Sequence, residues 1–372
     1  MRLVWISARD LESDLAATTE ISLGQTLTSL GVEFTLISPG KIENGKFGHV
    51  EVKRLSLPGI NTFSGARDIR RRILADFVLA DRADCVLVDW RYVKPLETEL
   101  ARLAVPWLIT DRGPPASSGL RGGRIGRELL RNLQKRFWSS GWRVANSYAS
   151  GGFVVSSEHR KLVNGITGGN LEVFVLPAGT EPNQLLGEKT DPSINLKLVY
   201  IGRIDKKRGV SEIIHLSEAL TDSSINHSLT VVGEGDMENE MASRSELSES
   251  LHYQPKVPRE EIQRILADNH IGILPMPDIP VWRISSPLKL AEYLSAGLLI
   301  VGPRHPGNQL NGGEDWDLLT PSGDWVNDAV GRIERAVWGD WGQLSSSAIE
   351  SSQHLLWENI SKKLIQIIEN IA

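Results

Sequence analysis

The chain of 372 residues contains a single cysteine, Cys85, and this scarcity excludes several kinds of protein. One cysteine cannot form an intrachain disulfide, and it cannot build a cysteine-based zinc site. The sequence therefore predicts a reducing, cytoplasmic environment rather than a disulfide framework.

Long apolar runs are also missing. No uninterrupted apolar stretch approaches the ~20 residues that a membrane span requires. The opening MRLVWISARD has a strand-like pattern and lacks the basic-then-apolar layout of a signal peptide. We expect no membrane span and no leader in this sequence.

Charge of one sign does not dominate, since the formal net charge is only −5. Lys and Arg exceed Asp and Glu in residues 1–180, whereas acidic residues are in excess in the remainder. The basic half would suit an anionic acceptor or a membrane surface, or the charges merely solvate two surfaces. Nucleic-acid binding is not expected, because the acidic half would repel phosphates outside a small cleft.

Short apolar, β-branched runs alternate with longer amphipathic segments along the chain. The expected strands are LVWIS (3–7), FTLIS (34–38), CVLVD (85–89), WLIT (107–110), FVV (153–155), VFVL (173–176), KLVYIG (197–202), SLTVVG (228–233), IGILP (271–275) and LLIVG (298–302). This alternation predicts an α/β protein with parallel sheets. The Pro/Gly-rich VLPAGTEPNQ (175–184) would separate two Rossmann-like domains, 1–178 and 179–345, that face each other across a ligand-binding cleft.

The stretch YIGRIDKKRGVSEII (200–214) places a basic loop between a strand and a helix. Helix N-termini favour phosphate, and guanidinium groups bind it bidentately. Gly202, Arg203, Lys207 and Arg208 therefore form a candidate diphosphate site. The alternative interpretation is a solvated basic turn.

A second strand-turn-helix, TVVGEGDMENE (230–240), follows. Gly233 and Gly235 would let the backbone approach a ligand, and Glu234 or Asp236 would meet a ribose or a base edge. A tight turn without ligand contact fits these residues equally well. The third glycine of the dinucleotide fingerprint is absent, so nicotinamide binding is not supported.

In SPLKLAEYLSAGLLIV (286–301), Lys289 and Glu292 share one face of an otherwise apolar helix. Pro287 suits the first helical turn, and a preceding serine suits the N-cap. One interpretation is a weak surface ion pair. A cation near a helix N-terminus opposes the helix dipole, however, which favours a bound anion at this position.

The order of GRIDKKRG, LTVVGEGDMENE, VPREEIQRILADNHIGILP and SPLKLAEYLSAGLLIVG resembles the donor-binding half of family-4 glycosyltransferases with the GT-B fold. The resemblance covers about residues 150–372 well and the first 150 loosely. The final HLLWENISKKL is similar to the family's C-terminal helix. This similarity implies that residues 346–372 form a helix that crosses back onto the N-terminal domain.

The resemblance also assigns roles. Arg203 would contact the donor diphosphate, and the family's lysine falls on Arg208, with Lys207 beside it. Glu292 would hold the ribose hydroxyls and Lys289 would lie near the phosphates. Ile284 stands where the family has a glutamate that contacts the transferred sugar, and this departure bears on catalytic competence. The expected donor-binding set is Gly202, Arg203, Lys207, Arg208, Gly233, Glu234, Ser286, Pro287, Leu288, Lys289 and Glu292.

The chemistry expected from this resemblance is transfer of a hexose-type sugar from a nucleoside-diphosphate sugar. A basic clamp would stabilise the leaving diphosphate. No Asp-x-Asp motif stands where a metal-dependent transferase would need it, so we expect metal-independent transfer with no cofactor beyond the donor substrate. Family resemblance implies retention of the anomeric configuration.

The acceptor would belong to the first half. Asp111, after a predicted strand, is a candidate catalytic residue or a turn cap. The predicted helix 124–138 aligns Arg124, Arg127, Arg131 and Lys135. It is either a solvated basic face or a peripheral contact with the inner face of the membrane. The acceptor itself would be a glycan, a lipid-linked molecule or a small molecule.

Two other functions remain open at this point. A sugar-nucleotide epimerase of the same architecture would need acids and a histidine in the cleft. A non-catalytic nucleotide-binding paralogue is kept open by Ile284.

Overall fold

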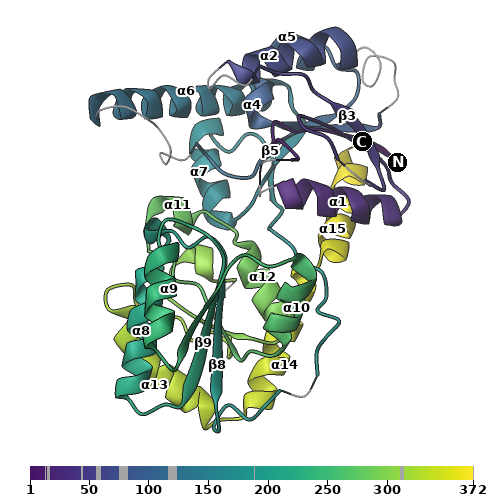
Figure 1. The fold of residues 1–372 in the computed structure, drawn as a ribbon. Coiled ribbons are helices and arrows are strands. Elements are labelled where there is room, and N and C mark those ends of the chain that lie inside the picture. Colours follow the sequence, from purple (N-terminus) through teal and green to yellow (C-terminus); the bar gives the residue numbers. More distant parts are fainter. Residues whose placement is uncertain are drawn as a thin grey trace. The chain divides into compact units, whose positions relative to one another are not determined.

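The computed structural model describes residues 1–12, 14, 17–42, 45–55, 60–74, 83–115, 124–187, 189–310 and 314–371 (Figure 1). These residues form two compact units. The first consists of Met1–Pro177 and Trp357–Ala372, and the second consists of Ala178–Leu356. The chain passes from the first unit to the second inside the Pro/Gly-rich segment 175–184.

The first unit contains a seven-stranded sheet in which every neighbouring pair of strands is parallel. Its spatial order is β3-β2-β1-β4-β5-β6-β7. The strands are β1 (Arg2–Ile6), β2 (Glu33–Ser38), β3 (Gly48–Glu51), β4 (Cys85–Asp89), β5 (Trp107–Asp111), β6 (Gly151–Val154) and β7 (Val173–Val175). The central strands β4 and β5 are buried along their whole length, which explains their continuous apolar sequences.

Helices cover this sheet and one of them comes from the C-terminus of the chain. They are α1 (Thr18–Ser29), α2 (Asn61–Asp68), the π-helical turn Ile69–Ile73, α4 (Trp90–Val93), α5 (Glu97–Leu100), α6 (Arg124–Tyr148), α7 (Ser157–Thr167) and α15 (Trp357–Ile371). Helix α15 packs against α1. It buries Trp357, Ile360, Leu364 and Ile368 on one face.

The second unit contains a five-stranded parallel sheet in the order β10-β9-β8-β11-β12. Its strands are β8 (Leu196–Ile201), β9 (His227–Val232), β10 (Leu251–Gln254), β11 (Ile271–Ile273) and β12 (Leu299–Val301). Its helices are α8 (Ser211–Asp222), α9 (Glu238–Leu247), α10 (Arg259–Ala267), α11 (Pro280–Arg283), α12 (Leu288–Ser295), α13 (Trp325–Val337) and α14 (Trp341–Ser352). In Figure 1, α8, α9 and α13 lie on one side of β8 and β9, and α10, α12 and α14 lie on the other. The predicted α/β class with two parallel sheets is confirmed.

The C-terminal segment differs from the single helix predicted for residues 346–372. Helix α14 ends at Ser352, a 3₁₀ turn follows over Gln353–Leu355, and Leu356 is extended, with φ −68° and ψ 138°. The amide of Thr180 donates to the carbonyl of Leu355 at 2.9 Å. This hydrogen bond holds the break within the second unit, so only α15 belongs to the first.

Candidate functional site

The basic loop begins where β8 ends, at the carboxyl edge of the second sheet. A 3₁₀ turn occupies Lys206–Arg208, and Gly209 then adopts a left-handed conformation with φ +77° before α8 begins at Ser211. A Cβ atom at Gly209 would lie 2.1 Å from the carbonyl oxygen of Pro275, so only glycine fits. The loop therefore delivers the N-terminus of α8 and its basic side chains to one edge of the sheet.

Asp205 lies between the two arginines of this loop. Arg203 donates from Nη2 to Asp205 Oδ1 at 3.0 Å, and Arg208 Nε lies 3.6 Å from Asp205 Oδ2. The arginine side chains are 41% and 32% exposed, whereas that of Asp205 is 9% exposed. Burial acts to raise the pKa of Asp205, but hydrogen bonding and charge from Arg203, with the charge of Arg208, hold it below the ordinary value.

The ring of Trp282, on α11, contacts the second of these arginines. The guanidinium carbon of Arg208 lies 5.0 Å from the ring centroid, which is a cation–π arrangement. We call Arg203, Asp205, Arg208 and Trp282 the Asp205 cluster. The loop after β9 meets the same place, because Arg203 Nη1 lies 3.8 Å from Glu234 Oε1.

The turn after β9 is held tightly against the end of β8. A Cβ at Gly233 would lie 1.8 Å from the carbonyl oxygen of Gly202, so the two glycines permit a close backbone approach. The amide of Lys206 donates to Asp236 Oδ1 at 2.8 Å. Glu234 and Lys207 are exposed. The structure thus brings the predicted basic loop and the predicted G-x-G turn together.

Helix α12 is fixed to the same edge by Tyr293, whose hydroxyl accepts a hydrogen bond from the amide of Ile201 at 2.9 Å. On its surface, Lys289 Nζ lies 2.6 Å from Glu292 Oε2. The two residues predicted to make separate ligand contacts therefore pair with each other in this structure. Leu288 starts the helix and is partly exposed.

The residues before α12 differ from the predicted capping. Pro287 occupies the N-cap position and makes no side-chain capping bond. Ser286 Oγ instead accepts from the amide of Ala178 at 2.9 Å, and Ser285 Oγ donates to the carbonyl of Trp282 at 2.7 Å. The serines thus order the α11–α12 connection. Ile284 is the C-cap residue that follows α11.

Asp205, Trp282 and Tyr293 are the residues of this edge that sequence reasoning did not select. Asp205 interrupts a basic run, which is the signal that would have identified it. The positions of Trp282 and Tyr293 depend on packing between separate elements, and no sequence motif indicates them.

For Asp111 in the first unit, the structure favours the turn-cap alternative over the catalytic one. Its side chain is fully buried. Trp138 and Trp142 donate from Nε1 to Asp111 Oδ2 at 2.6 and 2.9 Å, and His159 Nε2 lies 3.3 Å from the same oxygen. Oδ1 accepts from the amide of Gly113 at 3.0 Å. The carboxylate therefore holds α6 and α7 on β5 and presents no oxygen to a substrate.

The electrostatics of this group, which we call the Asp111 cluster (Asp111, Trp138, Trp142 and His159), match that role. Burial acts to raise the pKa of Asp111, but His159 and the two indole donors keep it below the ordinary value. The aspartate is thus held ionised in the interior. It anchors the fold of the first unit.

A second group of buried charges in the first unit consists of Arg9, Glu20 and Arg112, and Arg112 directly follows Asp111 in the sequence. Arg9 Nε lies 3.1 Å from Glu20 Oε1, and Arg112 donates to the carbonyl of Leu176 at 2.9 Å. Burial raises the pKa of Glu20 against the charges of Arg9 and Arg112, and burial lowers the pKa of Arg112 to about 10. Sequence reasoning gave this group no role.

Helix α6 exposes apolar side chains in the predicted basic helix. Leu129, Leu130 and Leu133 are exposed, as are Lys135 and Arg136. The side chains of Arg124 and Arg127 lie outside the described residues, although the helix backbone there is described. In the described ranges, no helix is both long and apolar enough to traverse a membrane.

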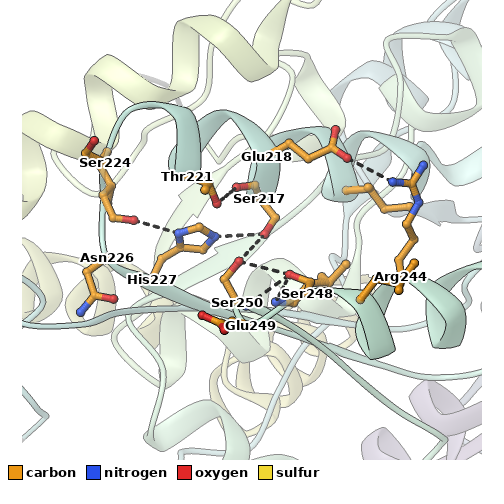
Figure 2. Close-up of a pocket in the computed structure, with 14 residues that line it drawn as sticks. Ser217, Glu218, Thr221, Ser224, Asn226, His227, Arg244, Ser248, Glu249 and Ser250 are labelled. Carbon is orange, nitrogen blue, oxygen red and sulfur yellow. Dashed lines mark hydrogen bonds and ion pairs between the residues drawn. The ribbon is translucent and has the colours of Figure 1, made fainter.

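A pocket of about 740 Å³ lies between α8, α9 and the starts of β9 and β10 (Figure 2). His227 Nε2 accepts from Ser217 Oγ at 3.0 Å, because its other ring nitrogen donates to the carbonyl of Ile225. Hydroxyl contacts continue to Ser250 and Ser248. The pocket lies at the edge of the second sheet where β9 and β10 begin, whereas the loop of the Asp205 cluster follows the carboxyl end of β8.

Comparison with protein-family models adds a further observation. Residues 195–337 match the model described as glycosyl transferases group 1, a range that contains the whole Asp205 cluster and α12. Residues 195–337 are therefore similar to this family, whereas the rest of the chain lies outside the match. The comparison with curated protein sequences finds no match.

The fold of the whole chain is similar to that of solved glycosyltransferases. Sucrose-phosphate synthase from Thermosynechococcus elongatus is 16% identical, with a TM-score of 0.75 over 100% of this chain and 99% of that chain. HepE from Anabaena, solved in complex with UDP, is 14% identical, with a TM-score of 0.67 over 100% of both chains. WaaG, a glycosyltransferase of lipopolysaccharide biosynthesis, is 14% identical, with a TM-score of 0.67 over 98% of this chain and 99% of that chain.

The TM-scores of these matches show the fold of the chain. The predicted GT-B fold is thereby confirmed, and the predicted resemblance to glycosyltransferases is confirmed over residues 195–337.

Proposed function

We propose that this protein is a glycosyltransferase that moves a hexose-type sugar from a nucleoside-diphosphate sugar to an acceptor hydroxyl, with retention of configuration. The observation that carries the proposal is the pair Arg203 and Arg208, fixed by Asp205 at the N-terminal side of α8 inside the range that matches the group 1 family. Guanidinium groups and a helix N-terminus together suit a diphosphate. The UDP complex of HepE supports the same donor class.

Charge development explains why this arrangement would suffice for the chemistry. The sugar carbon becomes positive while the nucleoside diphosphate leaves with negative charge. Arg203 and Arg208 would stabilise that leaving group more strongly in the transition state than in the ground state. Lys289 would exchange its contact with Glu292 for a phosphate oxygen, and Glu292 would then accept from the ribose hydroxyls.

We propose that the two arginines take the place of a divalent cation and that the donor is the only small molecule required. Turnover is then expected to persist in EDTA. The configuration at the transferred anomeric carbon, followed by NMR, is expected to equal that of the donor. An inverted product or a strict requirement for a divalent metal would contradict this part of the proposal.

The decisive experiment pairs donor binding with group transfer. Thermal-shift measurements against UDP-, GDP- and ADP-sugars identify the donor, because a ligand that binds only the folded state raises Tm. Release of the nucleoside diphosphate is then measured with candidate acceptors. Donor binding without turnover on any acceptor would favour the non-catalytic paralogue, and an epimerised free donor would favour the epimerase.

We propose a peripheral membrane contact through α6 as the finer description of the acceptor side. Leu129 and Leu133 are 60% and 50% exposed, and Lys135 and Arg136 are exposed close by. Apolar side chains that insert at an interface next to cations are suited to an anionic lipid surface. A lipid-linked acceptor at the cytoplasmic face of the membrane would fit this contact.

Co-sedimentation with vesicles tests the membrane contact. The variant L129E/L133E is expected to lose binding to vesicles that contain phosphatidylglycerol, and wild type is expected to bind neutral vesicles weakly. The control is Leu247→Glu, because Leu247 is 86% exposed on the second unit. Equal binding of both variants to the anionic vesicles would exclude α6 as the contact.

A further inference from the structure

Asp205 lies in an unusual position for an acidic residue in a predicted anion site. It is almost buried, and both of its oxygens face the guanidinium groups of Arg203 and Arg208, at 3.0 and 3.6 Å. Arg203 Nε is a further 3.4 Å contact to Oδ2. A negative charge here reduces the positive potential offered to a diphosphate, so its presence needs a compensating benefit.

We propose that Asp205 is a positioning residue that holds Arg203 and Arg208 in the geometry required by the donor diphosphate, with Trp282 fixing the second arginine from its other side. This inference rests on the proposed function. It adds Asp205 and Trp282, neither of which belongs to the donor-binding set expected from the sequence. Neither residue touches the substrate in this role, because both act through the arginines.

The physical need for Asp205 follows from the charges gathered at the end of β8. Arg203, Arg208 and the N-terminus of α8 bring positive charge to one place, and two guanidinium groups repel each other. A carboxylate that accepts hydrogen bonds from one and attracts the other holds them side by side. Long arginine side chains otherwise lose much rotamer freedom when they bind a ligand, so fixing them beforehand favours binding.

Trp282 restricts Arg208 by a contact of a different kind. The guanidinium lies over the ring at 5.0 Å, and Ser285 Oγ donates to the carbonyl of Trp282 at 2.7 Å. The tryptophan backbone also meets a close approach, because a Cβ at Gly307 would lie 1.8 Å from that carbonyl oxygen. The backbone that carries the indole is therefore fixed by Ser285 and packed closely against Gly307, and the indole in turn contacts Arg208.

The two roles open to Asp205 predict effects of opposite sign, which makes the inference testable. If Asp205 only offsets charge, its neutralisation strengthens the positive potential and tightens diphosphate binding. If Asp205 positions the arginines, its neutralisation frees them and weakens binding despite the gain in positive charge. Asp205→Asn keeps the side-chain shape and separates these outcomes.

The experiment measures Kd for UDP, GDP and ADP by calorimetry, together with kcat, KM and Tm. For Asp205→Asn we expect Kd of the bound diphosphate to rise about tenfold and kcat to fall by up to about 10²-fold, the cost of misplaced catalytic groups. Asp205→Glu, which restores the charge, is expected to recover part of both losses. Glu218→Gln is the matched control, because it removes a carboxylate paired with Arg244 near the pocket in Figure 2.

Trp282→Leu provides a second variant that does not depend on Asp205. It is expected to raise Kd of the diphosphate without affecting Arg203, so its effect is smaller than that of Asp205→Asn. If Asp205→Asn does not fold, a higher Kd of the diphosphate in Trp282→Leu, at unchanged Tm, still supports the positioning role. Unchanged or tighter binding in every folded variant of these two residues overturns it.

The failure of this inference and the failure of the proposed function give different results. If wild type binds none of the three diphosphates, the proposed donor chemistry fails. If wild type binds one of them and Arg203→Ala abolishes that binding while Asp205→Asn and Trp282→Leu do not weaken it, the donor site stands and the positioning role alone fails.

Discussion

The carboxyl edges of the two sheets carry clusters of similar composition that differ in access. In the second unit, Asp205 is almost buried while its two arginine partners keep 41% and 32% of their side-chain surface exposed. In the first unit, Asp111 and the indoles of Trp138 and Trp142 are all buried. The same residue type, an aspartate at the carboxyl end of a parallel strand or in the loop that follows it, thus orders two partly exposed arginines in one unit and lies inside the core in the other.

This difference teaches that the partners of a carboxylate decide its role. Long arginine side chains carry the charge of the Asp205 cluster outward, toward solvent. The single N–H group of each indole already donates to Asp111, so the Asp111 cluster presents no polar group to solvent. Donor binding is therefore expected to respond to the Asp205 cluster, and folding of the first unit is expected to respond to the Asp111 cluster.

The largest expected effect comes from removing the exposed charge of the second unit. Arg203→Ala is expected to reduce kcat by on the order of 10²–10³-fold, as with the loss of one preorganised electrostatic donor. Its Tm should remain close to that of wild type, because the guanidinium is partly exposed. Arg244→Ala is the control, since it removes an arginine from an exposed ion pair in the same unit. Unchanged turnover in Arg203→Ala would end the assignment of the donor site.

The next effect tests the closed cluster of the first unit. Asp111→Ala leaves two buried indole donors and His159 without their acceptor, and we expect a loss of about 3 kcal/mol in the free energy of unfolding. Affinity for the donor diphosphate should be unchanged where the variant is folded. Urea denaturation and calorimetry measure the two quantities separately. A stable variant that lacks turnover would instead restore Asp111 as a catalytic residue.

The sequence predicts the interior strands of both sheets and one edge strand of each, β7 and β12, and it misses the other edge strand of each sheet. The strand expected over 85–89 is observed as β4 at Cys85–Asp89, because a strand buried on both faces requires a continuous apolar run. The edge strands β3 and β10 were not predicted. Their sequences, GHVE and LHYQ, alternate or mix polar residues because edge strands are partly exposed.

The candidate site follows the same rule. The basic loop was predictable because strand, loop and helix are consecutive in the sequence. The stacking of Arg208 on Trp282 was not, because it depends on how α11 packs beside that loop. The sequence left Asp111 open between a catalytic role and a turn cap, because it does not reveal that Trp138 and Trp142 fold back onto the carboxylate.

The pH dependence of stability distinguishes the two units further, because the second unit contains the buried histidine His270. Burial, with the charges of Lys189 and Lys197, lowers the pKa of His270 from the ordinary histidine value of about 6.5 to about 4. The unfolded chain therefore binds the proton more readily, so the stability due to neutral His270 is complete above pH 6.5 and is lost as pH falls toward 4. We expect a loss of about 2 kcal/mol at pH 5 relative to pH 8.

Hydrogen exchange of the β8 and β11 amides, corrected for the intrinsic rate, measures this loss. His270→Gln is expected to flatten the pH dependence, and exposed His215→Gln is expected to leave it intact. Amides of β4 and β5 should change less, because Asp111 remains ionised across the whole window. An equal loss in both units would show that His270 does not set the acid limit of the second.

The smallest expected effect concerns the ion pair on α12, and it separates stability from binding at one position. Lys289 and Glu292 are partly exposed, so Glu292→Gln is expected to change the free energy of unfolding by only about 0.3 kcal/mol. If Glu292 accepts from the donor ribose, the same variant loses about tenfold in donor affinity, or about 1.4 kcal/mol. Glu358→Gln, which breaks the exposed Lys362 pair on α15, is the control and should change neither quantity by more than the ion pair itself. Equal donor affinity in Glu292→Gln and Glu358→Gln would reduce the α12 pair to a surface contact and leave the Asp205 cluster as the donor-binding element of the second unit.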